Sequence, residues 1–334
     1  MATRAFCVTC GGVAAISLLL WRLSNKALRS QNRQRKIVVR AGFDVGSGAT
    51  KMEVASFDAL TQEPQKVLFS EQEEALFSHD LASNGGEKLS PAMQEEGMRI
   101  LSKFRKIASG HGCSADDMRG IATAVFRKAK NGGEFLQRIR DELGIMLRCI
   151  DQKLEGKIGF EIPPNIRYMT GRAYAKAGSN VIVWDSGGGS FQITGELKSG
   201  DVEMFGGALG SSVVTEMAVK LQGKSFTKVK SPNPMSLPDI ESLQKAILSV
   251  VSSIPRPAWL AEAIGSGAEV IAIGGATCAF RMCEMATGGQ KPFTLPRLEA
   301  AIKELKMRSD AELEQLGYPQ ETMVSASMNA VFQL

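Results

Sequence analysis

The stretch VIVWDSGGGSFQITG, residues 181–195, places an aspartate and three consecutive glycines between two apolar runs. Glycine loses more backbone freedom on folding than any other residue, so three in a row inside a strand-like segment are costly. Such a run is expected where something approaches the backbone so closely that side chains must be absent. The segment therefore predicts a strand, a glycine turn with a close contact, and a second strand.

A similar pattern occurs earlier in the chain, in AGFDVGSGATKMEVASFD at residues 41–58. When Asp44 is placed over Asp185, both stretches show an apolar run, an aspartate, a glycine turn containing serine, and a second alternating run. A repeated unit 141 residues apart predicts two similar domains that face each other across a cleft. A chance match between two short glycine-rich hairpins is the alternative.

The glycine turns are candidates for phosphate binding. A turn without side chains lets successive backbone N–H groups point at one oxyanion. Neither turn has the Walker pattern, and neither leads into a helix as a dinucleotide-binding fingerprint does. A single cluster is also compatible with a structural hairpin turn in which the aspartate bonds its own backbone. A third cluster, IGGAT at residues 273–277, favours phosphate.

Acidic side chains beside phosphate loops require a compensating charge. Asp44 and Asp185 could each hold a metal ion against phosphate oxygens, or orient a water molecule. Arg127, which follows a short apolar run, matches phosphate geometry with paired donors better than lysine does. Lys128 and Lys130 are interpreted as a solvated helix entry.

The rest of the chain predicts alternating strands and helices, which indicates an α/β architecture. A strand is expected over residues 37–43 and a second one through Ser56, whereas residues 59–88 are irregular and polar. A helix should begin at the cap residue Ser90 and another should end at Gly144. Between them, MRGIATAVF at residues 118–126 predicts a short strand.

The net charge of +5 belongs to the start of the chain. Residues 1–40 contain eight lysines and arginines and no acidic residue, which leaves 32 basic and 35 acidic residues in the remainder. That remainder carries a net charge of −3, which argues against a general nucleic-acid-binding surface.

An apolar stretch over residues 5–21 is near the lower length limit for crossing a bilayer. The basic residues that follow favour the cytoplasmic side for the rest of the chain if this leader is a membrane anchor. A mitochondrial or plastid presequence is the rival interpretation, because the segment is free of acidic residues. Membrane contact through the leader therefore stays an open expectation.

Seven segments match, in order, the motifs of a known family: FDVGSGATK, LSPAMQEEGMRILSKFRKIASGHG, IATAVFRKAKNGGEFLQRIRDELGI, IDQKLEGKIGF, VWDSGGGSFQIT, LGSSVVTE and AIGGATCAF. Over about residues 38–330 the chain resembles the exopolyphosphatase / guanosine pentaphosphate phosphohydrolase (Ppx/GppA) family, within the actin–hexokinase–Hsp70-like (ASKHA) superfamily. Seven ordered matches are far more specific than any one of them.

The resemblance implies an α/β fold of two ASKHA (ribonuclease H-like) domains. The expected divisions are a leader at residues 1–36, an N-terminal domain at 37–151 and a C-terminal domain at 152–334. The second domain is expected to be truncated, because the chain stops at VSASMNAVFQL, before the family's segment S-D-x-G-L-R-E-G. Oligomeric state is left open, with a homodimer among the expectations.

The resemblance also implies hydrolysis of a terminal phosphoanhydride in polyphosphate or a guanosine polyphosphate, with a divalent cation, usually Mg²⁺. Glu155 matches the family's catalytic carboxylate, the general base that activates water. Asp44 and Asp185 are the implied metal ligands. The implied phosphate-binding residues are Gly46, Ser47, Lys51, Arg127, Gly187, Gly188, Gly189, Ser190, Gly274 and Gly275.

Two site positions depart from the family pattern. Gln192 stands where the family usually has glutamate, so a second-shell or water-positioning role is expected for it, without a negative charge. Lys51 replaces a frequent arginine, which loses bidentate geometry. Gln192 and the missing C-terminal segment support an alternative to an active hydrolase, namely a catalytically weakened protein that binds polyphosphate or nucleotide for regulation.

Overall fold

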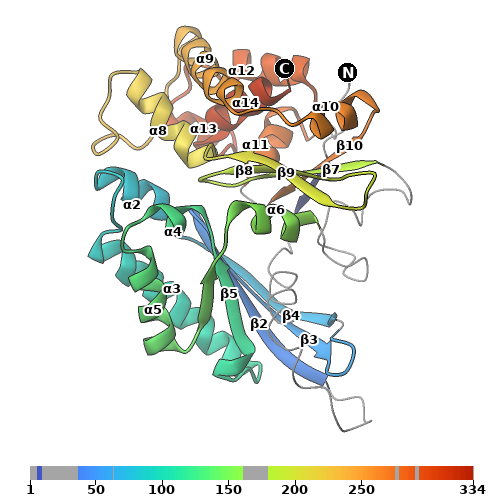
Figure 1. Ribbon diagram of the computed structural model, residues 1–334. Helices are drawn as coiled ribbons and strands as arrows, with labels where there is room; N and C mark the ends of the chain where they lie inside the picture. The colour runs from blue at the N-terminus through green and yellow to red at the C-terminus, as the bar shows by residue number, and fades with distance from the viewer. Residues whose placement is uncertain are drawn as a thin grey trace. The chain divides into compact units, whose positions relative to one another are not determined.

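The computed structural model describes six ranges of the chain: residues 6–9, 37–62, 64–160, 180–274, 278–289 and 293–333. The chain divides into two compact units, each with one five-stranded sheet (Figure 1). The N-terminal unit is Gly11–Met169, and the C-terminal unit is Thr170–Leu334 together with Met1–Cys10. Of the leader, only the backbone of residues 6–9 falls within the described ranges.

The sheet of the N-terminal unit has the order β4-β3-β2-β5-β6. Three strands form an antiparallel meander, and the two others run parallel to β2. The strands are β2 (Ile37–Val45), β3 (Ala49–Asp58), β4 (Pro64–Glu74), β5 (Met118–Ala122) and β6 (Met146–Cys149). Because β2, β5 and β6 are parallel neighbours, the segments that leave their carboxyl ends meet at one edge of the sheet.

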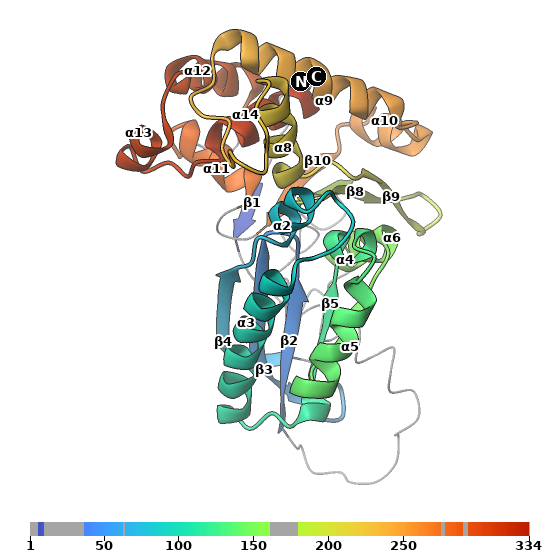
Figure 2. The same cartoon turned by 90° about the vertical axis from the view of Figure 1, so that its left-hand side faces the viewer.

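Two long helices, α3 (Pro91–Gly110) and α5 (Gly132–Leu143), lie side by side across one face of this sheet (Figure 2). The Ser90 side chain accepts a hydrogen bond from the backbone of Met93, which confirms the predicted cap of α3. Gly144 adopts the left-handed conformation at the end of α5, with φ of 67°, as expected for a glycine that stops a helix.

Two expectations for this unit were wrong. Residues 59–88 are not irregular, because they contain the strand β4 and the short helix α2 (Phe77–Ser83). The strand β4 lies at the sheet edge with most side chains exposed, so it lacks the hydrophobic alternation of a half-buried strand. The strand predicted through residue 126 ends at Ala122, and its remainder forms α4 (Ala124–Lys128), whose Phe126 packs on Phe77.

The sheet of the C-terminal unit has the order β1-β10-β7-β8-β9. It repeats the arrangement of the first sheet, with an antiparallel meander of three strands and two parallel strands beside it. The strands are β1 (Phe6–Thr9), β7 (Val181–Ser186), β8 (Phe191–Glu196), β9 (Val202–Gly207) and β10 (Glu269–Gly274). The predicted duplication of a strand–turn–strand unit is therefore confirmed.

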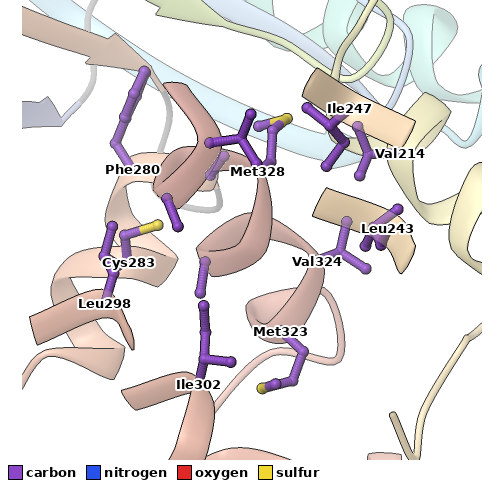
Figure 3. Packing of buried hydrophobic residues seen from close by; sticks show 14 of the residues in the cluster. Val214, Leu243, Ile247, Phe280, Cys283, Leu298, Ile302, Met323, Val324 and Met328 are labelled. Atoms are coloured by element: carbon purple, nitrogen blue, oxygen red, sulfur yellow. The ribbon is translucent and has the colours of Figure 1, made fainter. Parts of the chain in front are cut away.

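The helices of this unit surround one central helix, α14 (Thr322–Phe332), in which Thr322 to Val331 are all buried. It packs against α8, α9, α11 and α12, and Figure 3 shows the apolar side chains that meet there, among them Val324 and Met328. The surrounding helices are α8 (Ser211–Leu221), α9 (Leu237–Ser253), α10 (Ala258–Gly265), α11 (Ala279–Ala286), α12 (Leu295–Leu305) and α13 (Asp310–Gln315).

No helix within the described ranges is long and apolar enough to cross a membrane.

One acidic side chain of β3 is buried. Glu53 lies opposite Gly42 of β2 and Ser70 of β4, and only 2% of its surface is exposed. Its Oε1 atom has no hydrogen-bond partner within the described part of the chain. Burial disfavours the charged form and raises the pKa of the Glu53 carboxyl to about 8.

We predict that Glu53 makes stability fall as pH rises. Its pKa is raised from an unfolded value of about 4.3, so between that pH and 8 the folded protein keeps a proton that the unfolded chain has released. The free energy of unfolding should then decrease by up to about 1.4 kcal/mol per pH unit. Glu53→Gln should remove this slope, as measured by urea unfolding at several pH values in that window. Parallel pH profiles for the two proteins would contradict the prediction.

Candidate functional site

The first glycine turn connects β2 to β3 directly after Asp44. Gly46 N–H donates to the carbonyl of Ala49 at 2.9 Å and closes the turn. The carbonyls of Ser47 and Gly48 accept hydrogen bonds from the N–H groups of Ser78 (2.9 Å) and Ala75 (3.0 Å). Among the described residues, no acceptor is found for the N–H groups of Ser47 and Gly48. The turn therefore has bound carbonyls and two open amide donors.

The second glycine turn connects β7 to β8 and repeats the closing bond and the two open amides of the first, although its bound carbonyls lie one position earlier. Gly187 N–H donates to the carbonyl of Ser190 at 2.9 Å, the same pair of positions shifted by 141 residues. The carbonyls of Gly187 and Gly188 accept from the first N–H groups of α8, at 3.0 and 2.9 Å. In the described ranges the N–H groups of Gly188 and Gly189 have no acceptor. Two adjacent open amides suit an oxyanion.

Each turn has an aspartate on its first strand and an aligned partner on its second. Asp44 pairs with Lys51, and Asp185 pairs with Gln192, again 141 residues apart. Lys51 Nζ lies 3.5 Å from Asp44 Oδ2. Residues directly opposite on antiparallel strands share one face of the sheet. The first aspartate therefore faces an ammonium group, and the second lies opposite a neutral amide.

A third feature of the N-terminal unit joins Arg127 of α4 to Glu155 of α6 (Gln152–Phe160). Arg127 Nη1 lies 2.8 Å from Glu155 Oε2 and donates to the carbonyl of Ile150, also at 2.8 Å. The two side chains are 25% and 16% exposed. The helices α4 and α6, which carry Arg127 and Glu155, follow the carboxyl ends of β5 and β6. These ends lie at the same sheet edge as the end of β2 that carries Asp44.

The guanidinium of Arg127 retains donors for a ligand. A guanidinium has five N–H groups on three nitrogens, and both contacts within the described ranges use Nη1. Paired donors in one plane match two oxygens of a phosphate. The pair thus places an oxyanion donor and a carboxylate at the same sheet edge.

The remaining predicted phosphate-binding residues within the described ranges lie in the two turns and at the end of β10. Ser47 and Ser190 are buried within their turns. Gly274 is the last residue of β10, and a Cβ there would lie 2.5 Å from the Cβ of Cys278, so this position requires glycine for packing. Gly275 lies outside the described residues. Asp44, Lys51, Arg127 and Glu155 belong to the N-terminal unit, whereas Asp185, Gln192 and Gly274 belong to the C-terminal unit.

The donor chemistry of the two aspartates fits a cation that is shared with a substrate. No group of three or more His, Cys, Asp or Glu side chains that could hold a metal is found in the part of the chain that the structure describes. Mg²⁺ usually binds through one or two carboxylates together with phosphate oxygens and waters, not through an all-protein cage. A single aspartate beside each open-amide turn agrees with that mode of binding.

Sequence reasoning missed the residue that holds the second turn in place, Gly210. A Cβ at Gly210 would lie 2.4 Å from the carbonyl oxygen of Gly187 and 2.5 Å from the carbonyl of Gly188. The start of α8 is thus the backbone that approaches the bare glycine turn. The signal was present in LGSSVVTE, but its packing reason depends on contacts between segments distant in sequence.

We predict that Gly210→Ala displaces the second turn and weakens phosphate binding. The added methyl group would overlap backbone atoms of Gly187 and Gly188, so either the turn or α8 must move. Overpacking of this kind typically costs about 1–3 kcal/mol of stability. Gly265→Ala, at a position where a Cβ meets nothing within 4 Å, is the control. Phosphate affinity measured by calorimetry should fall for the first variant only. Unchanged affinity in Gly210→Ala would contradict the prediction.

Comparison with curated proteins identifies partial relatives. The chain is 24% identical over 180 residues to a bifunctional 3-dehydroquinate synthase/phosphatase of Fusobacterium nucleatum, a match that covers 53% of this chain and 26% of the relative. It is 25% identical over 113 residues to exopolyphosphatase 1 of Mycobacterium tuberculosis, covering 34% of this chain and 30% of the relative. The matched region thus spans less than a third of the length of these relatives.

Comparison with solved structures shows the fold. The Ppx/GppA family member of Aquifex aeolicus has a TM-score of 0.60 at 17% identity, with 89% of each chain covered. An exopolyphosphatase of Cytophaga hutchinsonii has a TM-score of 0.61 at 16% identity, with 88% of each chain covered. The two-sheet α/β architecture of these proteins is therefore also that of this chain, which confirms the predicted fold class.

The sequence model of the Ppx/GppA phosphatase family matches residues 54–223, about half of the chain. This region includes part of the first hairpin, the Arg127–Glu155 pair, the second glycine turn and α8. The chain belongs to the Ppx/GppA phosphatase family.

Proposed function

We propose that the protein is a metal-dependent phosphoanhydride hydrolase that releases terminal phosphate from inorganic polyphosphate or guanosine pentaphosphate. Membership of a phosphatase family supports hydrolysis of phosphate compounds in general. The observation that supports the finer proposal is the Arg127–Glu155 pair, because it sets a carboxylate and a guanidinium 2.8 Å apart at the sheet edge of an open-amide turn.

Substrate binding is assigned to donors that the fold already holds in place. Ser47 and Gly48 in the first turn, and Gly188 and Gly189 in the second, offer amide N–H groups to phosphate oxygens. Donors that are preorganised need no rearrangement when charge develops on the phosphate during the reaction. Arg127 and Lys51 add positive charge in the N-terminal unit.

Glu155 is proposed as the general base. An ionised carboxylate can accept the proton of a water molecule as that water attacks the terminal phosphorus. The contact with Arg127 Nη1 orients the carboxylate, and the anchor to the carbonyl of Ile150 fixes the guanidinium in turn. As the new P–O bond to the water oxygen forms, the phosphoanhydride P–O bond breaks and its electron pair goes to the bridging oxygen of the shortened chain. Glu155 takes the proton of the water and later returns it to solvent, and orthophosphate and the shortened chain are released.

Asp44 and Asp185 are the residues proposed to hold a divalent cation, Mg²⁺ or another, against the phosphates. A bound cation would neutralise the negative charge that accumulates on the phosphate oxygens. Each aspartate is the last but one residue of its strand and precedes its own turn, which supports this role.

The second candidate function is a regulatory protein that binds polyphosphate or nucleotide with little turnover. Gln192 favours it, because the amide opposite Asp185 cannot contribute negative charge to a metal or accept a proton. This candidate predicts binding without hydrolysis and a gain of rate on Gln192→Glu.

We also propose a location in the cell and an oligomeric state for the protein. The basic leader at residues 1–36 is proposed to associate the protein with a membrane, with the catalytic part on the cytoplasmic side, or to direct it to a mitochondrion or plastid. A homodimer is the proposed assembly.

We predict that Glu155→Gln lowers phosphate release by roughly 10²–10⁴-fold, because the amide cannot act as a base. The assay uses the purified full chain with long polyphosphate, tripolyphosphate, guanosine pentaphosphate and ATP in separate reactions. Glu134→Gln, an exposed glutamate of α5 in the same unit, is the matched control and should keep full activity. Removal of divalent cations by a chelator should abolish release, and added Mg²⁺ should restore it.

Phosphate release from none of the four substrates would contradict the hydrolase. Release that is equal in wild type and Glu155→Gln would contradict the role of Glu155. Saturable binding without release would support the regulatory candidate.

A further inference from the structure

The side chain of Gln192 makes one defined contact in the second turn. Its Nε2 atom donates a hydrogen bond to Ser190 Oγ at 3.0 Å. Both side chains are buried, with 1% and 4% of their surface exposed. Ser190 is also the residue whose carbonyl closes the turn by accepting from Gly187 N–H. The contact therefore lies at the end of the turn, directly after the open amides of Gly188 and Gly189.

The direction of this hydrogen bond determines where the Ser190 proton points. A serine hydroxyl has one proton to donate and two lone pairs that accept. Because Gln192 Nε2 is the donor, Ser190 Oγ accepts there and its own proton is directed elsewhere. The described residues offer that proton no acceptor. The Ser190 hydroxyl directly follows the amides of Gly188 and Gly189, which also have no acceptor within the described ranges.

We propose that Gln192 is a positioning residue that holds the Ser190 hydroxyl as a third donor to the phosphate bound in the second turn. The inference rests on the proposed function, because it takes that turn to be a phosphate site. It assigns to the amide a role that a carboxylate at the same position could not have.

A glutamate at position 192 would reverse the hydrogen bond. An ionised carboxylate only accepts, so the Ser190 hydroxyl would donate to it and turn away from the phosphate. It would also place a second negative charge directly opposite Asp185, and like charges at such positions are destabilising. Compared with a glutamate at position 192, the glutamine thus removes one negative charge from the turn and leaves the Ser190 hydroxyl free to donate to an anion.

The position of the first hairpin that corresponds to Gln192 also carries a side chain with N–H donors, Lys51. Lys51 lies opposite Asp44 as Gln192 lies opposite Asp185. Both side chains carry N–H donors, and neither adds negative charge. In this chain the aligned position of each hairpin therefore favours an anion in the turn.

A double-mutant cycle on the full chain tests the proposal, with tripolyphosphate binding measured by calorimetry. Gln192→Glu should weaken binding by roughly 10–100-fold, because it withdraws a hydrogen bond to a charged group. Ser190→Ala should weaken it by about tenfold or more for the same reason. If Gln192 acts through the hydroxyl, Gln192→Glu should have much less effect in the Ser190→Ala background.

Gln192→Met is the second variant, in case the buried carboxylate of Gln192→Glu prevents folding. It has similar volume and no amide, so the hydroxyl is no longer held and binding should weaken by several-fold. In the Ser190→Ala background this variant should bind like Ser190→Ala alone. In turnover assays, the losses should appear mainly in KM, with kcat less affected.

Additive losses in the Gln192→Met cycle, which changes no charge, would overturn the proposal, and so would a gain of affinity in Gln192→Glu. If the wild-type protein binds tripolyphosphate without hydrolysing any substrate, and the variants lose affinity non-additively, this role of Gln192 would be supported and the proposed hydrolase contradicted. Wild-type protein that neither binds nor hydrolyses would overturn both.

Discussion

The rest of the site depends on how the two glycine turns use their backbone hydrogen bonds. In each turn the first glycine closes the loop, through Gly46 to Ala49 and Gly187 to Ser190, and neighbouring segments donate to two carbonyls of the turn. The amides of the two residues after the closing glycine have no acceptor within the described ranges. Two pairs of open amides at equivalent positions of the two hairpins favour a ligand that is an anion.

The two hairpins share this geometry but differ in the side chains around it. The N-terminal unit adds an ion pair, Arg127 with Glu155, at the same sheet edge as its turn. The C-terminal unit has instead a buried amide–hydroxyl contact between Gln192 and Ser190. The same hairpin geometry thus carries an ion pair beside it in one unit and a neutral amide–hydroxyl contact in the other.

Local patterns made part of this structure predictable. The aspartate–glycine hairpins, the cap at Ser90 and the stop at Gly144 depend on residues close in sequence, and all of them are present. The strand β4 was not predicted, because an exposed edge strand lacks the alternation of apolar and polar residues that marks a half-buried strand. Two features of the site were not predicted either. The approach of Gly210 to the second turn is a tertiary contact, which spacing does not encode. The bond from Gln192 to Ser190 joins residues that are close in sequence, but it depends on the direction of two side chains, which composition and spacing do not encode either.

Binding of phosphate by the open amides of the two turns can be measured by nuclear magnetic resonance of the ¹⁵N-labelled full chain during titration with tripolyphosphate. We expect saturable downfield shifts of the amide protons of Ser47, Gly48, Gly188 and Gly189. The amides of Gly46 and Gly187, which already donate within their turns, should shift less and serve as internal controls. Saturable shifts confined to other residues, or no saturable shift at all, would show that the turns do not bind phosphate.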